Sequence, residues 1–195
     1  MAHHIYKINT LGKLISSTSE MIYTLKYLNP YYNTQYLKHA SYVLDDYYKN
    51  NNSDWVKYIN TNDYNEFGYH KTSIFTSNLI ENVNININCN IITWSPYAKT
   101  EFHGHDSMGC IMMPLRGYLK QDLMLSEICN SLLLPKINNN IYKSNLIYPS
   151  ETSYIDDDIG YHRITNDNDK VCVSLHIYYN YDEHETITGI EKLAN

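Results

Sequence analysis

Three side chains with metal-binding and redox chemistry lie close together in the segment FHGHDSMGC, residues 102–110. His103 and His105 are separated by one residue, and Cys110 follows five positions after the second histidine. If the segment is an extended strand, both histidines point to one face, because strand side chains alternate. Two imidazoles on one face form a pair of metal ligands. A polar strand edge produces the same pair by chance, so the rest of the chain has to decide.

The segment VCVSLHIYY, residues 171–179, supplies a second group of polar side chains. As a strand, it presents an apolar face of Val171, Val173, Leu175 and Ile177, and an opposite face of Cys172, Ser174, His176 and Tyr178. Burying three hydrogen-bonding groups in a row is unfavourable unless they belong to a polar site. The solvent-facing side of an edge strand gives the same pattern, so both interpretations stay open.

His162 is a third candidate ligand. It follows a glycine-containing turn in YIDDDIGYHRI and begins the strand-like segment HRITN. A histidine pair with another histidine further along the chain is typical of a metal site when the strands share one barrel. A structural histidine that is simply hydrogen-bonded is the alternative.

The elements that must position these residues change in character along the chain. Helical periodicity predicts helices over residues 16–28 and 33–49 and a short third helix over residues 52–59. From about residue 69, short β-branched or aromatic runs alternate with Asn, Asp, Pro and Gly. Helices followed by many strands indicate helices packed on an antiparallel β-barrel or sandwich.

The composition is typical of one globular domain. The chain has 195 residues, of which 43% are hydrophobic and 18% charged, and its formal net charge is −6. This charge argues against a nucleic-acid partner, and no segment approaches the ~20 apolar residues that a membrane span needs. The first residues lack the apolar core of a signal peptide, and the four cysteines include no CxxC pair. We therefore expect a cytoplasmic protein with free thiols.

The ordered set of segments resembles the cysteine dioxygenases, which are thiol dioxygenases of the cupin fold. The resemblance covers residues 52–59, WSPYAKTEFHGHDSMGCIMMPLRGYL and YIDDDIGYHRITNDNDKVCVSLHIYY. Trp94 stands nine residues before His103 and Gly117 seven after Cys110, both in the family's register, and SLHIY resembles its closing Ser-x-His-x-Tyr strand. The resemblance implies a mainly β fold with N-terminal helices, built around a cupin (double-stranded β-helix) barrel. It implies a single domain over residues 1–195, with a helical part at 1–66 packed on a β-barrel at 67–195.

The resemblance also implies the metal and its ligands. The residues that would bind one ferrous ion are His103, His105 and His162. Open coordination positions would then take a substrate thiolate and dioxygen. Three histidines also hold zinc in other proteins, so iron comes from the resemblance and not from counting ligands.

In the family, a cysteine at the position of Cys110 forms a thioether bond to the tyrosine of the closing strand, which is Tyr178 here. Ser174 and His176 would hold and polarise the Tyr178 hydroxyl. The alternative for Cys110 is a small buried hydrophobic residue, which is the commoner fate of a cysteine.

The substrate-binding segment departs from the family's pattern. A Tyr-x-Arg segment binds the substrate carboxylate in the family, whereas this chain has no arginine there. One alignment places Tyr69 and Lys71 at these positions, and an ungapped count back from Trp94 places Phe75 and Ser77 there. We favour the first, because the tyrosine, a cation and the following Ile-Phe pair all correspond. A lysine cannot hold a carboxylate through two parallel hydrogen bonds.

Two arginines are other candidate cations, Arg116 and Arg163. Arg163 directly follows a candidate ligand, so strand alternation predicts that its side chain points away from the metal.

The resemblance implies an iron-dependent dioxygenase that converts L-cysteine and O2 to cysteine sulfinic acid and serves cysteine catabolism. We expect a monomer whose partners are a small-molecule thiol and O2, without nucleic acid or membrane. One alternative is another small thiol, such as 3-mercaptopropionate or cysteamine. Further alternatives are a metal-binding cupin without oxygenase activity, and a zinc or manganese cupin with isomerase or hydrolase chemistry.

Overall fold

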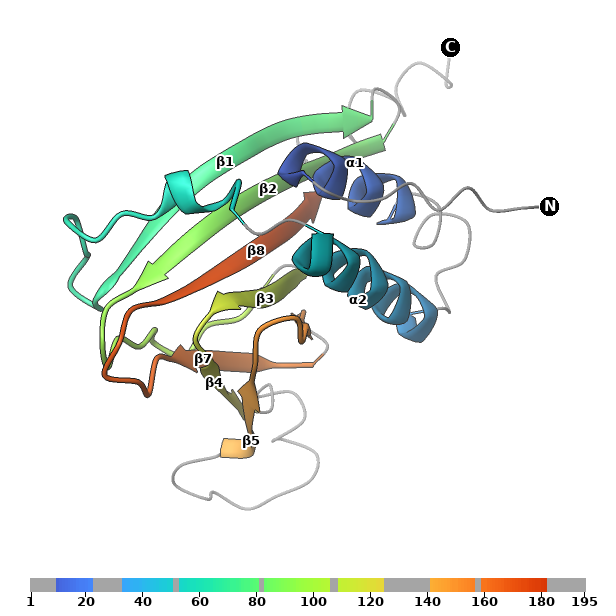
Figure 1. The fold of residues 1–195 in the computed structure, drawn as a ribbon. Coiled ribbons are helices and arrows are strands. Elements are labelled where there is room, and N and C mark those ends of the chain that lie inside the picture. Colours follow the sequence, from blue (N-terminus) through green and yellow to red (C-terminus); the bar gives the residue numbers. More distant parts are fainter. Residues whose placement is uncertain are drawn as a thin grey trace, which may run out of the picture.

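The helices precede the strands along the chain, as the periodicity predicts (Figure 1). The computed structural model describes residues 10–22, 33–50, 53–80, 83–105, 109–124, 141–156 and 159–181. The helical elements are α1 (Leu11–Ile22), α2 (Asn33–Asn50) and a 3₁₀ turn at Val56–Tyr58. The strands are β1 (Tyr69–Ile80), β2 (Val83–Trp94), β3 (Cys110–Arg116), β4 (Leu119–Met124), β5 (Ile141–Ile147), β6 (Ser153–Ile155), β7 (Tyr161–Thr165) and β8 (Cys172–Tyr181).

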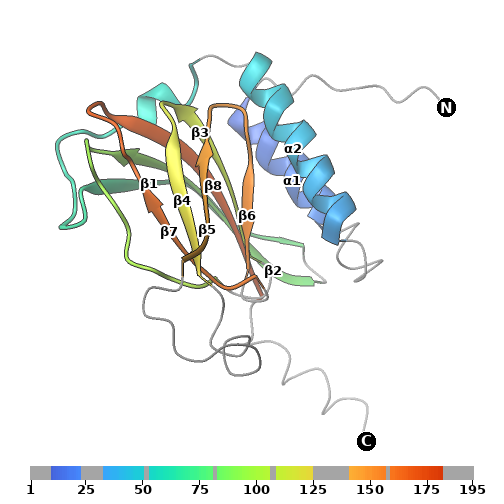
Figure 2. The ribbon, with the colours of Figure 1, turned by 90° about the horizontal axis from the view of Figure 1, so that it is seen from below.

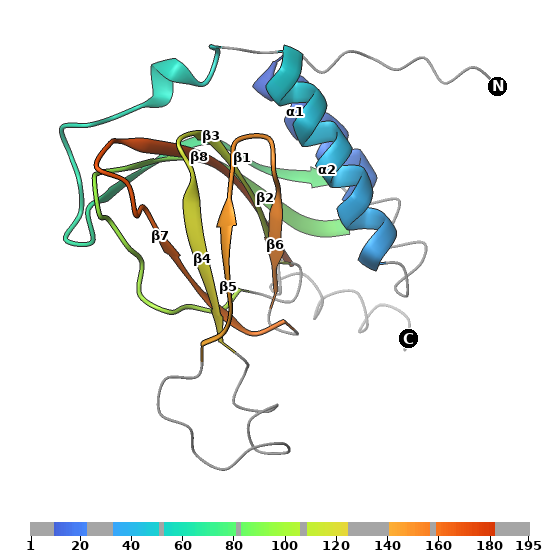
Figure 3. The ribbon, with the colours of Figure 1, turned by 60° about the horizontal axis from the view of Figure 1, so that its bottom comes forward.

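The strands form two antiparallel sheets that face each other (Figure 3). The larger sheet has the order β1-β2-β8-β3-β6, and the smaller has the order β5-β4-β7. Figure 2 shows α1 and α2 side by side on one flank of the larger sheet. This arrangement confirms the predicted class, a mainly β fold of antiparallel sheets with N-terminal helices. The first strand begins at Tyr69, and the division of the chain at residue 67 stays a prediction.

The central strands of the larger sheet are buried on both faces, because helices cover one face and the smaller sheet covers the other. The layer against the helices includes Leu14, Leu44, Tyr47, Ile87, Ile91, Met113, Val173, Leu175, Ile177 and Tyr179. The layer between the sheets includes Ile92, Trp94, Met112, Leu119, Ile147, Ile164 and Cys172. Ser174 and His176 are therefore buried on the inner face of β8. The solvent-facing interpretation of this strand is wrong.

The helical predictions need correction at two places. The first helix begins at Leu11 and not at residue 16, while residues 23–28 of the predicted span lie outside the described residues. The third helix is only a 3₁₀ turn. Within its predicted span of residues 52–59, Asp54 accepts hydrogen bonds from the Leu11 backbone N–H at 2.8 Å and the Tyr47 hydroxyl at 2.5 Å. Trp55 is buried in the core, so tertiary contacts replace a helical turn here.

Three of the four cysteines lie in the described part of the chain, and Cys89, Cys110 and Cys172 are free thiols there. Cys129 lies outside it. Among the described helices, none combines the length and the apolar character that crossing a membrane requires.

Candidate metal centre

Three imidazole rings converge on one point at the wall of a cavity. The Nε2 atom of His162 lies 2.9 Å from that of His105 and 3.1 Å from that of His103. One ring nitrogen from each histidine lies within 4.8 Å of the others. Among the described residues, these three side chains form the group that could hold a metal ion. Because a single ion can be reached by all three nitrogens, the donor set fits one divalent metal.

The backbone brings the histidines together through a bridge between segments far apart in the sequence. His103 and His162 form an isolated antiparallel β-bridge, in which each backbone N–H donates to the other's carbonyl at 3.0 and 2.9 Å. Paired residues carry their side chains on the same face, so the two rings become neighbours. The segment around His103 and His105 is otherwise a connection between β2 and β3 and not a named strand, so strand alternation does not explain how these two rings come together.

The second nitrogen of two of these rings is held by a defined partner. His103 Nδ1 donates to the Glu101 carbonyl oxygen at 3.0 Å. His162 Nδ1 lies 2.9 Å from Gln121 Nε2, and Gln121 Oε1 accepts a hydrogen bond from Ser153 at 2.6 Å. Sequence reasoning missed Gln121 and Ser153. The sequence did carry a signal for Gln121. It is a polar residue two positions after the apolar Leu119, so strand alternation places both side chains on the same inward face.

Burial favours the neutral form of His105 and His162. Burial, together with a smaller contribution from the neighbouring His103, lowers the pKa of His162 to about 2 and that of His105 to about 4. Burial also holds the pKa of His176 well below its usual value. A neutral imidazole offers a lone pair to a metal, whereas an imidazolium does not. The cluster is therefore ready to bind a cation at neutral pH.

The cavity in front of the histidines has a volume of about 520 Å³, and its wall includes Tyr69 and Lys71. The Tyr69 ring packs against the Trp94 ring with 5.2 Å between centroids, and Lys71 Nζ lies 4.5 Å from the centroid of the Tyr178 ring. Phe75, which the ungapped count favours, packs instead in the layer under the helices. The side chain of Ser77 lies outside the described residues.

Cys110 and Tyr178 are directly opposite each other on β3 and β8. Burial raises the pKa of both side chains, between which a hydrogen bond forms. His176 links this pair to the core: its Nδ1 lies 3.9 Å from Cys110 Sγ, and its Nε2 lies 2.8 Å from Ser174 Oγ. Ser174 in turn accepts a hydrogen bond of 2.8 Å from the Trp94 indole.

The His176 ring stacks on the Tyr178 ring with 6.0 Å between centroids. The expected polarisation of the Tyr178 hydroxyl by His176 stays a prediction.

The two arginines lie away from the cavity. Arg163 pairs with buried Asp122 at 2.7 Å and lies 4.7 Å over the Phe102 ring, so its side chain points away from the histidines, as alternation predicts. Arg116 lies 5.4 Å over the Trp55 ring. Among the described residues that line the cavity, Lys71 is thus the one lysine or arginine.

Comparisons with known proteins agree on a family. The sequence profile of cysteine dioxygenase type I matches residues 27–187. Relatives include cysteine dioxygenase type 1 of Bos taurus, 28% identical over 132 residues, and that of Rattus norvegicus, 29% identical over 133 residues. Both alignments cover 67% of this chain and 59% of the relative's length.

Solved structures match this chain at lower identity. An oxalate oxidase in complex with the substrate analogue glycolate has a TM-score of 0.48 and 17% identity, over 66% of this chain and 58% of that one. A Cupin_2 domain of an XRE family transcriptional regulator from Enterobacter cloacae has a TM-score of 0.40 and 14% identity, over 60% and 99%. Likeness at this level carries no argument about function.

Proposed function

Because this chain belongs to the cysteine dioxygenase type I family, we propose that it is an iron-dependent thiol dioxygenase that oxidises L-cysteine to cysteine sulfinic acid. The observation that carries the proposal is the convergence of His103, His105 and His162 at the cavity wall. His103, His105 and His162 would hold a ferrous ion, which would supply positions for a thiolate and O2 and so the oxidation of the thiol to a sulfinic acid. The three neutral rings leave the metal's charge uncompensated, which favours the thiolate form of the substrate.

Lys71 is the residue to which we assign the substrate carboxylate. Its ammonium group lies beside Tyr178, on the wall that also carries the histidines. A carboxylate at Lys71 leaves the thiol of the same small molecule free to turn toward the histidines. Tyr69, packed on Trp94, forms the adjacent wall and limits the volume available to the substrate.

We assign Cys110 and Tyr178 to a thioether cross-link. Their pairing across β3 and β8 supports this assignment, since the thiol then lies beside the phenol ring. The new bond joins Cys110 Sγ to a ring carbon of Tyr178. It removes the thiol hydrogen and one ring hydrogen, and O2 accepts these two electrons and two protons. His176 contacts Cys110 through Nδ1 and stacks on the Tyr178 ring, and Ser174 in turn holds the His176 ring through Nε2.

Another small thiol, such as cysteamine or 3-mercaptopropionate, is the second candidate substrate. The observation that favours cysteamine, which has no carboxylate, is the single point charge of Lys71 at the cavity wall, where a guanidinium would bind a carboxylate through two hydrogen bonds. Because the alignments cover 59% of the relatives' length, the relatives' substrate is a proposal for this chain and not a transferred property.

Iron content and sulfinate formation, measured on the same protein, test the proposal. We expect one ferrous ion per chain after anaerobic loading, with sulfinate formed from L-cysteine faster than from cysteamine or 3-mercaptopropionate. His162→Ala should lose iron and activity together, because one of three ligands is removed. The matched control is His70→Ala, since His70 contacts Asp63 outside the cavity.

Three outcomes separate the alternatives. Full iron occupancy without sulfinate contradicts oxygenase activity and favours a metal-binding cupin. Purification with stoichiometric zinc or manganese favours isomerase or hydrolase chemistry. Faster oxidation of another thiol overturns the choice of L-cysteine alone.

A further inference from the structure

A glutamine side chain lies directly behind one of the three histidines. Gln121 on β4 is only 3% exposed, and its amide contacts Nδ1 of His162, the ring nitrogen that does not face the cavity centre. The other nitrogen, Nε2, faces the equivalent atoms of His103 and His105. Gln121 is therefore placed to control how His162 presents its lone pair, without itself entering the cavity.

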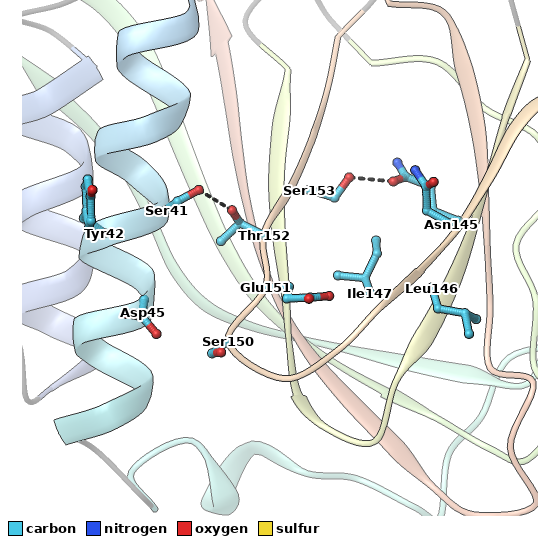
Figure 4. Close-up of a pocket in the computed structure, with 11 residues that line it drawn as sticks. Ser41, Tyr42, Asp45, Asn145, Leu146, Ile147, Ser150, Glu151, Thr152 and Ser153 are labelled. Carbon is cyan, nitrogen blue, oxygen red and sulfur yellow. Dashed lines mark hydrogen bonds between the residues drawn. The ribbon is translucent and has the colours of Figure 1, made fainter.

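The amide of Gln121 is held from its other end as well. Ser153 on β6 donates to Gln121 Oε1 at 2.6 Å, so a strand of the larger sheet fixes a side chain of the smaller sheet. Both residues line an outer groove of about 670 Å³ between α2 and the β5–β6 region. In Figure 4, Ser153 points across this groove toward the β-strands, whereas Thr152 points back to Ser41 on α2, to which it is hydrogen-bonded at 2.5 Å.

The tautomer of His162 decides which end of the amide must face it. An imidazole that binds a metal through Nε2 carries its proton on Nδ1 and needs an acceptor there. His103 already shows this arrangement, with Nδ1 donating to a backbone carbonyl oxygen. For His162, a half-turn of the Gln121 amide brings Oε1 to Nδ1 and the NH2 group to Ser153 Oγ. A hydroxyl accepts as readily as it donates, so every buried group keeps a partner in both states.

We propose that Gln121 is a positioning residue for the metal centre: its Oε1 accepts the Nδ1 proton of His162 in the metal-bound protein, and Ser153 locks the amide in that orientation. The proposal rests on the metal centre assigned under the proposed function. It has a chemical consequence, because a neutral amide strengthens the donor power of an imidazole less than a carboxylate does. Gln121 thus orients His162 while leaving the metal more positively charged than a carboxylate partner would.

Metal affinity of the purified protein tests this role. We would measure anaerobic binding of Fe(II) and Co(II) by competition with a chelator, and record the visible spectrum of the Co(II) form. Gln121→Met keeps the length of the side chain but removes the acceptor, and should weaken binding about 10–100-fold and change the Co(II) spectrum. Gln121→Glu keeps an acceptor for both Nδ1–H and Ser153, and should bind at least as tightly as the native protein.

Two further variants complete the design. Ser153→Ala removes the lock on the amide and should weaken binding by less than Gln121→Met. Thr152→Val is the matched control, because Thr152 is the neighbour that bonds Ser41 and not Gln121. The metal affinity of Thr152→Val should stay within about twofold of the native value. Loss of the hydrogen-bond acceptor of a ligating histidine should change the affinity by more than this. Thermal unfolding of each metal-free variant reports whether the fold is intact, and Gln121→Glu and Ser153→Ala carry the test if Gln121→Met does not fold.

The outcomes distinguish this inference from the proposed function. Native-like affinity of Gln121→Met overturns the inference, as does equal weakening by Gln121→Glu, which would mean that the glutamine only packs. A native protein that binds no metal overturns both. Graded affinities without sulfinate formation uphold the inference and overturn the proposed function alone.

Discussion

Lys71 shows how one side chain can set substrate preference. Its ammonium group is a single charge on a flexible stem, and it lies over the negative face of the Tyr178 ring. We predict that Lys71→Ala raises the KM for L-cysteine about tenfold with kcat little changed, because a charge-assisted hydrogen bond contributes about 1.5–3 kcal/mol. Lys71→Arg should lower the KM below the native value through bidentate contact. Initial rates of oxygen uptake measure both.

Two controls make this prediction specific. Ser73 is exposed on the same strand, so Ser73→Ala should leave the kinetics for L-cysteine unchanged. Cysteamine has no carboxylate, so its KM should not rise in Lys71→Ala. An unchanged KM for L-cysteine in Lys71→Ala would show that another group binds the carboxylate.

The cross-link assigned to Cys110 has a direct chemical signature. Its formation removes two hydrogen atoms, so the aerobically incubated iron protein should show a second band on a denaturing gel and a mass about 2 Da lower. We predict that Cys110→Ser abolishes both signals but keeps iron, because Cys110 is not one of the three ligands. Cys89→Ala is the control, since Cys89 is equally buried but faces the helices. Persistence of the doublet in Cys110→Ser would exclude this thioether.

At the scale of elements, the turn between β3 and β4 requires a glycine. Gly117 has φ of +71°, and a Cβ there would lie 2.4 Å from Cys172 Sγ on β8. We predict that Gly117→Ala lowers the free energy of unfolding by about 2–4 kcal/mol, because both the left-handed backbone and the overpacking are unfavourable. Adding Cys172→Ala removes the overpacking and should recover about half of the loss. Urea unfolding measures both variants.

Gly12 provides the comparison for this turn. It lies in α1, where an added Cβ meets only Thr10 Oγ1 at 4.0 Å, so Gly12→Ala should be neutral or slightly stabilising. Native-like stability of Gly117→Ala would show that the turn can change its backbone conformation without loss.

The elements also show which parts of the architecture are readable from sequence. The alternation along β8 predicted correctly that Val173 and Leu175 share a face opposite Ser174 and His176. Period-2 patterning is local, so a single strand carries it. The bridge that brings His103 to His162 joins segments 59 residues apart and has no local signal. The same holds for Gln121, whose partners lie on other strands.

The short segment at 52–59 was mispredicted for a related reason. Its polar and aromatic residues make contacts with α1, α2 and the core that outweigh helical propensity. A helix of one or two turns gains little from its own hydrogen bonds, so tertiary contacts decide its conformation. Family resemblance supplied the three histidines and the Cys110–Tyr178 pair, which composition alone left open.

At the scale of the whole molecule, the two faces of the larger sheet have different roles, one in stability and one in forming the cavity. Its outer face packs against α1 and α2 (Figure 1) and provides apolar burial. Its inner face carries the polar groups that surround the cavity. Strand β8 takes part in both, through Ile177 outside and His176 inside. Changes to the helix-facing layer are therefore expected to alter stability before they alter the geometry of the three histidines.

The buried histidines also make the stability of the metal-free protein depend on pH. A histidine in the unfolded chain has a pKa of about 6.5, whereas burial lowers it to about 4 for His105 and about 2 for His162, and also lowers that of His176. Below pH 6.5 the unfolded state therefore binds protons that the folded state does not, which favours unfolding as pH falls. The stabilisation is complete above pH 6.5 and is lost progressively below it.

We predict that the free energy of unfolding of the metal-free protein decreases between about pH 6.5 and 4, by about 1.4 kcal/mol per pH unit for each histidine kept neutral in the fold. Urea unfolding at successive pH values measures the slope. His162→Gln should reduce that slope by the contribution of one histidine, about 1.4 kcal/mol per pH unit, because glutamine is not protonated in this range. Bound metal should move the loss of stability to lower pH, since protons must then compete with the ion for the same nitrogens. A flat profile between pH 7 and 5 would mean that the histidine cluster is open to solvent and already protonates in the folded state.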